Sequence, residues 1–531
     1  MDDNPQPRFR LARAAMTRGG ASAWIGRTFG PDPRRVTRAW PRWIFLRALG
    51  LIFLSAFVSL GAPDLGALPR VPAPIHGLIG AGGARPIEAT LAAVARVEPG
   101  LLRFWAAPSL LWIDASDRAL LVLVVFGAAA SVLLTLNVAP RASVACAAAA
   151  FLSFVSVARE FSEYQSDGML LEAAAIAIAL APRGLRPGLA RDAPPSRAAI
   201  FLLKWEWFRI YFESGAVKLA SGDPTWRDLT AMTFHYETQP IPNPLAFYVH
   251  HLPIAFNKAS TALTLAIELL APLFIVGPRR LRLVAAAVLV GLQVLIAATG
   301  NFAFFNLLSI ALCVWLVDDA YVASAFRRTI GDHRASYEGP AKAGRHILSI
   351  AAAIVIVPVS LLHFTSSLGV LLPGWQLIAP IAELVSPLRS LNTYGLFAVM
   401  TTTRPEIIVE GSDDGERWQA YEFSYKPGDL HRRPPVVAPH QPRLDWQMWF
   451  AALGRYEENP WFQNFCARLL EGAPEVQRLL ARDPFGGRAP RYIRAELYQY
   501  HFAAMSQRRA DGVWWTRERL GAYSPVLSLR H

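Results

Sequence analysis

Long apolar segments recur along the first 371 residues of the chain, and shorter polar segments separate them. A helix needs about 20 apolar residues to cross a hydrocarbon core roughly 30 Å thick, and several of these segments have that length. The pattern therefore predicts a mainly α-helical membrane protein whose bundle has about nine spans. The predicted spans are 43–62, 119–138, 142–160, 168–182, 199–220, 261–277, 282–299, 303–318 and 347–371.

Basic residues in the connecting segments predict the orientation of these spans, because short cytoplasmic loops carry an excess of Lys and Arg. A nine-span arrangement brings the arginine-rich N-terminus to the same side as the basic segments 183–197, 279–280 and 327–334. We therefore expect all of these segments in the cytoplasm. The outer loop 63–118 also carries arginines, but charge in so long a loop constrains the orientation less.

This orientation divides the chain into three parts. Residues 1–42 are predicted to form a basic cytoplasmic segment, and residues 43–372 a transmembrane helical bundle with outer loops 63–118 and 221–260. Residues 373–531 are polar and numerous enough to form a soluble domain of their own on the non-cytoplasmic side.

This C-terminal part is predicted to be an α+β domain with a small antiparallel sheet. Alternating apolar and polar residues indicate short strands, and aromatic residues favour two more near the end, where the pattern is also compatible with helix. The predicted strands are Tyr394–Thr401, Glu406–Glu410, Trp418–Phe423, Tyr492–Phe502 and Val513–Arg519. The segment Ser412–Gly415 is predicted to be a turn, and residues 444–480 are predicted to be helical, with Pro460 near a helix start.

Composition supports the membrane assignment and narrows the function. The chain is 53% hydrophobic and only 18% charged, and its mean hydropathy is +0.28. The net charge of +13 follows from the basic loops, and no groove-reading motif accompanies it, so we expect no nucleic-acid partner. Cys146 and Cys313 fall in predicted spans, which leaves Cys466 without a soluble partner for a disulfide. No metal-binding spacing is present, so we expect neither a metal nor another cofactor.

The fifth predicted span, FLLKWEWFRIYFESGAVKLA, is unusual because it carries several charges. Charged side chains inside a membrane are costly and normally face a bundle interior or a cavity. The intramembrane charge set consists of Lys204, Glu206, Arg209, Glu213 and Lys218, with Glu172 and Glu268 in neighbouring spans. Helical spacing places Glu206, Arg209 and Glu213 on one face, so Arg209 is predicted to pair with both carboxylates. Glu172 and Glu268 are candidate partners of Lys218 or Lys204.

Two interpretations of these charges remain open. They form either a structural ion-pair network or a functional cavity. In the second interpretation Lys218 is a candidate base, with Glu213 and Glu268 as neighbouring carboxylates, although an ion pair would oppose its deprotonation.

The outer loop 222–253 combines aromatic, charged and proline residues in a way that predicts a folded segment. It is interpreted either as a structural lid or as a partner-binding surface. Its candidate residues are Trp226, Arg227, Asp228, His235, Tyr236, Glu237, Thr238, Gln239, Pro240, Asn243 and Pro244.

The same loop resembles the lipase maturation factor family along WRDLTAMTFHYETQPIPNPLAFYVHHLP, residues 226–253. Residues 300–320, 391–412, 426–454 and 483–503 are also similar to that family. The last segment departs from the family pattern at Asp483 and Ala489. In the C-terminal domain the resemblance includes Asn392, Tyr394, Gly395, Arg443, Asp445 and Trp446.

The resemblance implies a membrane-resident factor that helps secreted lipases to fold and assemble, without being a lipase or any other enzyme. Its partners would be the lipid bilayer and an exported client protein, and the sequence does not define an oligomeric state. Family members in animals act in the endoplasmic reticulum membrane. The alanine, arginine and proline content here is typical of bacterial proteins, and a bacterial member would lie in the inner membrane with a client that need not be a lipase.

An enzymatic alternative comes from a shorter resemblance. Residues 211–218, YFESGAVK, are similar to a Y-F-x-x-G-x-x-K segment in vitamin K-dependent carboxylase-like membrane proteins. This similarity implies a membrane enzyme that uses Lys218 as a base in an intramembrane Lys/Glu cavity, but the remaining catalytic residues are not identified.

Overall fold

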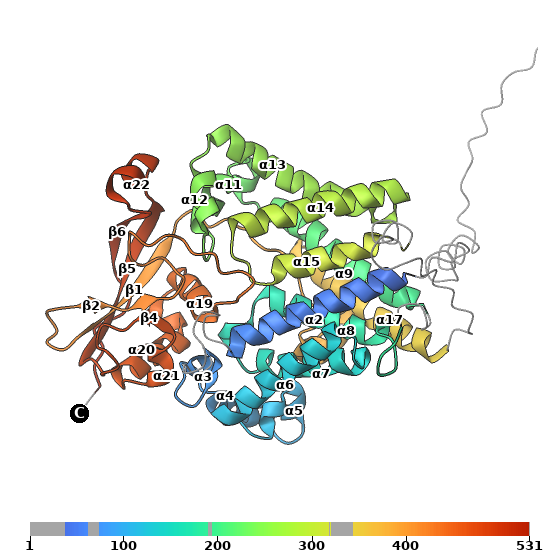
Figure 1. Cartoon of the computed structure of the whole chain (residues 1–531), viewed down its shortest axis with the longest axis horizontal. Helices are drawn as coiled ribbons and strands as arrows, with labels where there is room; N and C mark the ends of the chain where they lie inside the picture. The colour runs from blue at the N-terminus through green and yellow to red at the C-terminus, as the bar shows by residue number, and fades with distance from the viewer. Residues whose placement is uncertain (1–37, 62–73, 189–193, 318, 320–342, 530–531) are drawn as a thin grey trace, which may run out of the picture.

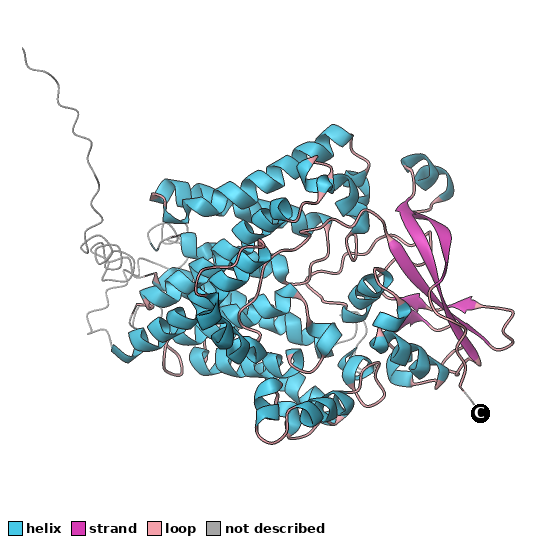
Figure 2. Ribbon diagram, turned by 180° about the vertical axis from the view of Figure 1, so that it is seen from behind, coloured by secondary structure: helices cyan, strands magenta, loops and turns pink. Residues whose placement is uncertain are grey.

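A computed structural model describes residues 38–61, 74–188, 194–317, 319 and 343–529. The predicted cytoplasmic segment up to residue 37 and the basic stretch 327–334 lie outside the described residues. In the described part, long helices run along the long axis of the molecule, and the strands gather at one end (Figures 1 and 2).

Each predicted span coincides with a helix. The bundle helices are α2 (Ala39–Gly61), α6 (Asp117–Thr135), α7 (Pro140–Val155), α8 (Gln165–Leu180), α9 (Arg197–Ala220), α13 (Ile254–Leu270), α14 (Arg279–Thr299), α15 (Phe305–Cys313) and α17 (Ala343–Ser367). Helices α13 and α15 continue as 3-10 turns at Ala271–Val276 and Val314–Leu316.

Five helices in the described residues are long and apolar enough to cross a bilayer. They are Ala39–Gly61, Asp117–Thr135, Ile254–Val276, Arg279–Thr299 and Ile347–Ser367. Helices α7 and α15 are apolar but shorter. Helix α8 has only 16 residues, and α9 has 24 but carries the charges described above. The structure is therefore a helical membrane bundle with five full-length candidate spans and additional helices packed among them.

Close packing in the bundle depends on small residues opposite large ones. Phe57 of α2 packs edge-on against Phe151 of α7, with ring centroids 5.9 Å apart. A Cβ at Gly127 of α6 would lie 2.2 Å from the Phe57 ring, so glycine allows α6 to approach α2. Such small-residue contacts are typical of helix packing in membranes, where apolar burial alone does not favour association.

The segments between the bundle helices fold into short helices, as the sequence predicts for 222–253. They are α3 (Pro74–Ile79), α4 (Ile87–Val97), α5 (Leu102–Ala106), α10 (Pro224–Arg227), α11 (Ala231–Thr238) and α12 (Pro244–His250), with 3-10 turns at Leu110–Trp112 and Arg159–Ser162. Asp223 accepts a hydrogen bond from the Thr225 N–H (2.8 Å) and Asn243 one from the Ala246 N–H (3.0 Å). Each is an N-cap followed by proline at the first helical position, a strong local start signal.

The C-terminal part combines a small antiparallel sheet with helices. Its elements are α18 (Trp375–Val385), a 3-10 turn (Ser386–Leu388), β1 (Pro405–Ser412), β2 (Gln419–Ala420), β3 (Glu422–Phe423), α19 (Arg443–Ala452), a 3-10 turn (Tyr456–Glu458), α20 (Pro460–Leu470), α21 (Pro474–Gln477), β4 (Leu480–Arg482), β5 (Tyr492–Phe502), α22 (Met505–Asp511) and β6 (Trp515–Ala522). The strands form a four-stranded sheet in the order β2-β1-β5-β6 and a pair β3-β4.

Most of the predicted strands are confirmed, with two corrections. The predicted strand Trp418–Phe423 is divided, because β2 pairs with β1 whereas β3 pairs with β4. The strand predicted at Tyr394–Thr401 is wrong. That segment is irregular and packs on the bundle, where Tyr394 is only 1% exposed. Its alternating pattern reflects contacts with helices on several sides rather than a pleated sheet.

One face of the four-stranded sheet is covered by α20. Ile407 of β1 and Ile493 of β5 share a buried cluster with Phe462 and Phe465 of α20. Residues 407 and 409 point to one face and residue 408 to the other, because successive strand residues alternate. The opposite face is therefore left for a different partner.

Candidate functional site

The outer loop 222–253 covers the second face of the four-stranded sheet. Phe247 of α12 belongs to the buried cluster on the second face, together with Ile408 and Tyr500. Its ring lies 5.2 Å from Phe502 and 4.9 Å from Trp514, centroid to centroid, both edge-on. The sheet is thus held between α20 and a helix that the bundle supplies.

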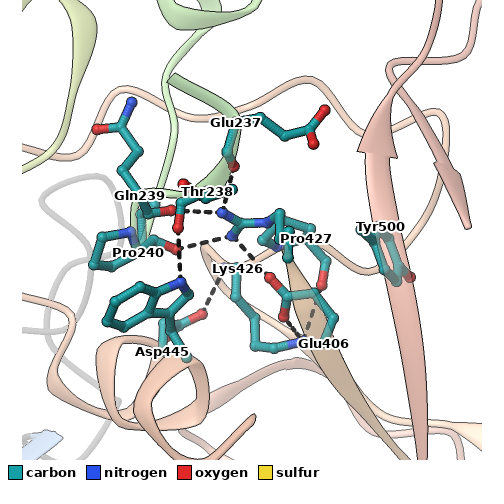
Figure 3. Close-up of polar contacts among 12 residues, drawn as sticks. Glu237, Thr238, Gln239, Pro240, Glu406, Lys426, Pro427, Asp445 and Tyr500 are labelled. Atoms are coloured by element: carbon teal, nitrogen blue, oxygen red, sulfur yellow. Dashed lines mark hydrogen bonds and ion pairs between the residues drawn. The ribbon is translucent and has the colours of Figure 1, made fainter. Parts of the chain in front are cut away.

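A fully buried guanidinium, that of Arg404, joins the outer loop to the start of β1. Its Nη1 donates to the carbonyl oxygens of Glu237 (2.7 Å) and Gln239 (2.5 Å), and its Nη2 to that of Pro240 (3.0 Å). Nη2 also lies 2.8 Å from Oε1 of Glu406. Figure 3 shows the loop carbonyls and Glu406 converging on this group. The planar fork of arginine suits such a cluster, because one side chain can satisfy several acceptors in fixed directions.

A second buried cation completes the cluster. Lys426 Nζ lies 3.0 Å from Oε2 of Glu406 and donates to the carbonyl oxygens of Ile407 (3.1 Å) and Pro427 (2.9 Å). Asp445 accepts hydrogen bonds from the backbone N–H of Lys426 (2.8 Å) and of the preceding residue (2.7 Å). Burial raises the pKa of the Asp445 carboxyl, and these two N–H groups oppose that rise.

The loop residues before Pro240 bind the C-terminal domain through both side chain and backbone. The Glu237 carboxylate accepts from the Phe502 N–H (2.7 Å) and lies 3.0 Å from Nδ1 of His501. The Thr238 carbonyl accepts from Nε1 of Trp449 (2.9 Å). Figure 3 shows Glu237 and Thr238 facing the C-terminal domain from the loop.

The same loop is also tied to the bundle. Gln239 Nε2 donates to the Thr299 carbonyl (2.8 Å), and Asn243 Nδ2 donates to the Ala298 carbonyl (2.9 Å). A Cβ at Gly300 would lie 2.3 Å from Oε1 of Gln239, so the chain approaches too closely there for any side chain. The loop therefore connects α14 to the sheet as one continuous junction.

Apart from the partly buried His235, the predicted loop residues separate into two groups. Most are buried in the junction: Trp226, Tyr236, Glu237, Thr238, Gln239, Pro240, Asn243 and Pro244. Trp226 donates its Nε1 hydrogen to the Phe397 carbonyl (2.9 Å), which anchors the irregular segment after Tyr394. Arg227 and Asp228 are exposed.

Inside the bundle, Arg209 has a different partner from the two that helical spacing predicts. It forms an ion pair with Glu172 of α8, and it donates through Nη1 to the Asn392 carbonyl (3.0 Å). The Tyr394 hydroxyl donates to the other oxygen of Glu172 (2.8 Å). The predicted C-terminal motif residues Asn392 and Tyr394 therefore lie against the bundle charges, and a Cβ at nearby Gly395 would lie 3.0 Å from Val217.

The other carboxylates of α9 lie near this cluster, but among the described residues neither forms a salt bridge with Arg209. Glu213 Oε1 accepts from the Ser367 hydroxyl of α17 (3.3 Å). Glu206 is fully buried, and its carboxylate has no hydrogen-bond partner within the described residues. Lys204 is half-buried and makes no ion pair with another described residue. Helical spacing predicts a shared face for Glu206, Arg209 and Glu213, but it does not identify the partners of Arg209 and Glu213, which come from other elements.

Lys218 and Glu268 form a buried ion pair between α9 and α13. Lys218 Nζ donates to both carboxylate oxygens, at 2.8 and 2.6 Å, and lies 5.1 Å from the Trp226 ring centroid. The pair borders a cavity of about 660 Å³, including its mouth, that is otherwise lined mainly by apolar and aromatic side chains. His235 of α11 also lines this cavity.

Sequence reasoning missed several buried charges. Arg443 forms a bidentate ion pair with Asp167 at the start of α8, in which Nη1 lies 2.7 Å from Oδ2 and Nη2 lies 3.0 Å from Oδ1. The ring of its neighbour Trp446 packs edge-on against Tyr164 at 5.4 Å. Asp167 lies outside the segments that resemble the family, whereas Arg404 and Glu406 lie within one of them, 391–412, but were not singled out. A charged residue at the first turn of an otherwise apolar helix was the available hint for Asp167.

Comparison with known proteins covers both parts of the chain. Residues 40–324 match the lipase maturation factor transmembrane domain, and residues 390–525 match the lipase maturation factor C-terminal domain. The chain is 35% identical to lipase maturation factor 1 of Bos taurus over 98% of this chain and 95% of that protein. It is 33% identical to lipase maturation factor 2 of Homo sapiens over 92% of this chain and 83% of that protein. Lipase maturation factor 1 of Homo sapiens is 35% identical over 80% and 77%.

No solved structure matches the chain significantly. The two domain matches include the bundle helices from α2 to α15, the junction loop and the sheet that the loop covers, whereas α17 and α18 lie between the matched ranges. The chain is an integral membrane protein and belongs to the lipase maturation factor family.

Proposed function

We propose that this protein is a membrane-resident maturation factor, without enzymatic activity of its own, that assists an exported client protein of the lipase class or another class. Family membership over most of the chain is the observation that carries the proposal. The buried junction supports it, because ion pairs and hydrogen bonds to the bundle would hold the outer loop and sheet as a rigid platform.

The proposal includes a topology. The chain would cross the membrane nine times, with the basic segment 1–42 in the cytoplasm and the domain 373–531 on the other side. Residues 43–372 would form the bundle, and the outer loops 63–118 and 221–260 would lie on the side of the C-terminal domain. The membrane would be the inner membrane in a bacterium and the endoplasmic reticulum membrane in a eukaryote.

Within the platform, the exposed part of the outer loop is the proposed client-facing surface. Helix α12 buries Phe247 against the sheet but leaves Leu245 45% and Tyr248 46% exposed. The exposed residues Arg227 and Asp228 precede it in the same loop. Exposed apolar side chains on a rigid support can bind partly folded chains without being reshaped themselves.

Deleting the gene in its host and measuring secreted lipase activity per molecule of lipase antigen tests the proposal. We expect the specific activity to fall, and to be restored by the wild-type gene. A Leu245→Ser/Tyr248→Ser variant should restore less, whereas a variant at Leu295, an exposed position on α14, should restore fully. Unchanged specific activity after deletion would exclude lipases as the client.

The second candidate function is a membrane enzyme that acts at the cavity beside Lys218. The observation in its favour is a buried lysine that borders a cavity lined mainly by apolar and aromatic side chains. Against it, the Glu268 carboxylate stabilises the ammonium form and so opposes use of Lys218 as a base. Replacing Lys218 alone would leave Glu268 uncompensated, so the informative variant is Lys218→Met/Glu268→Gln. An enzyme should lose turnover in this variant, whereas a maturation factor should still restore lipase specific activity.

A further inference from the structure

The cavity between α9, α11, α13 and α14 has a chemical character that the client-maturation function does not use. Its walls are largely aromatic and aliphatic, including Trp226, Met232, Ile296, Phe302 and Phe397. The space inside it, including its open mouth, is about 660 Å³, and its lining is mostly apolar with a few polar groups, as is typical of sites for small molecules.

Among the polar groups that line the cavity, the imidazole of His235 is the one that indicates a ligand. Its ring is stacked on Phe302, with centroids 6.2 Å apart and planes 9° apart, and lies edge-on to Phe397 at 4.7 Å. These two contacts fix the ring. Its Nδ1 is buried and has no hydrogen-bond partner among the described residues. A buried polar atom without a partner is costly unless something else satisfies it.

The charges around the cavity favour an uncharged ligand. Lys218 and Glu268 neutralise each other through two short hydrogen bonds, so the pair presents no net charge. Burial, and to a lesser extent the Lys218 charge, lowers the pKa of His235 to about 4, so the imidazole is neutral near pH 7. A charged ligand would have to enter an apolar space without a free counter-charge, which is unfavourable.

Partly exposed residues on two candidate membrane spans are among those that line the cavity, which favours access from the bilayer. Helices α13 and α14 are among the candidate spans that other parts of the protein bury least, with 28% of the apolar stretch of each buried. Met232, Thr264 and Ile296 line the cavity from α11, α13 and α14, and all three are only partly buried. A molecule dissolved in the bilayer would therefore meet the opening without crossing water.

We propose that this cavity is a binding site for an uncharged, lipid-soluble molecule with an apolar body and a hydroxyl or carbonyl group that hydrogen-bonds to Nδ1 of His235. The site does not depend on the client-maturation function, and it would also be the place where the enzymatic alternative puts its substrate. Binding is measured without client and without turnover, so its failure is distinguishable from failure of either function.

The test uses photo-crosslinking of the full chain in lipid nanodiscs. The probe is a monoacylglycerol with a diazirine in its acyl chain, and the comparison probe is the free fatty acid with the same chain, which is anionic. We expect saturable labelling by the monoacylglycerol, on peptides from 231–238, 254–270, 279–299 or 391–401, and much weaker labelling by the fatty acid.

Two adjacent positions on α14 provide a matched pair of variants. Ile296 lines the cavity, whereas Leu295 is 62% exposed on the surface of the same helix. Ile296→Trp should abolish the saturable labelling, and Leu295→Trp should leave it unchanged. His235→Phe keeps the stacked ring but removes the hydrogen-bonding nitrogen, and it should weaken binding roughly fivefold, as expected for one lost hydrogen bond.

Each variant is compared as monodisperse protein. If Ile296→Trp does not fold, Met232→Trp fills the cavity from α11 and provides the same comparison. Equal labelling of the filled-cavity variant and of the wild type would overturn the proposal. Equal labelling by the fatty acid would overturn the argument for an uncharged ligand, and unchanged affinity in His235→Phe would overturn the role of that residue.

Discussion

Replacing Arg404 with methionine should loosen the junction between the outer loop and the sheet. The guanidinium is fully buried, satisfies the carbonyl oxygens of Glu237, Gln239 and Pro240, and shares Glu406 with Lys426. Methionine fills similar space but leaves three carbonyls unpaired and removes one of the two cations on Glu406. Removing one partner from a buried pair costs about 3–5 kcal/mol. The open form of the junction should therefore become at least about one hundred times more populated.

Native-state proteolysis with proteinase K measures that population, because cleavage follows the open fraction when opening and closing are fast. We expect cleavage within 426–440 to accelerate by about two orders of magnitude in Arg404→Met, while the bundle stays intact. Arg404→Lys should be intermediate, because an ammonium keeps the charge but lacks the planar fork. The control is Arg417→Met, since Arg417 is 91% exposed in its ion pair with Asp414 and should change the rate little. Equal cleavage rates in Arg404→Met and Arg417→Met would refute the reasoning.

Three further predictions concern other parts of the molecule. Lys218→Met should reduce the amount of folded protein in the membrane, because it leaves Glu268 buried without its partner. Lys218→Met/Glu268→Gln should recover most of that amount, because no charge is left uncompensated. Quantitative immunoblotting of membranes measures the folded protein, and no recovery in the double variant would contradict the prediction. Gly300→Ala should destabilise the detergent-purified protein by about 1–3 kcal/mol, because the added methyl group would clash with Gln239 and Phe302. A methyl group at Gly291 would meet nothing within 4 Å, so Gly291→Ala should not destabilise the protein. Thermal melts of both variants measure the difference. The pKa of His235 is lowered to about 4 from an ordinary value near 6.5, so between these values the unfolded chain binds a proton at this residue and the folded chain does not. The free energy of unfolding should therefore fall as the pH drops from 6.5 towards 4. The melting temperature of His235→Phe should depend less on pH than that of the wild type, and an equal dependence would contradict the assignment.

The sequence by itself determined the features that depend on local spacing. Apolar runs located the bundle helices that the structure describes, because an apolar segment within a bilayer satisfies its own backbone groups as a helix. Local start signals, such as Asn243 before Pro244, located helices in the outer loop. The strands Pro405–Ser412 and Tyr492–Phe502 were also located from their own residues, although the fold covers both faces of the sheet.

The tertiary structure alone decided which charges meet. Arg209 shares a helix face with two glutamates, yet it pairs with Glu172 of another helix. Arg404 lies 164 positions from Pro240, and only the docked fold brings them to 3.0 Å. A buried charge takes the partner that packing places beside it, and that partner carries no local sequence signature. The same reason explains the failed strand at Tyr394–Thr401, whose pattern was set by the helices that surround it.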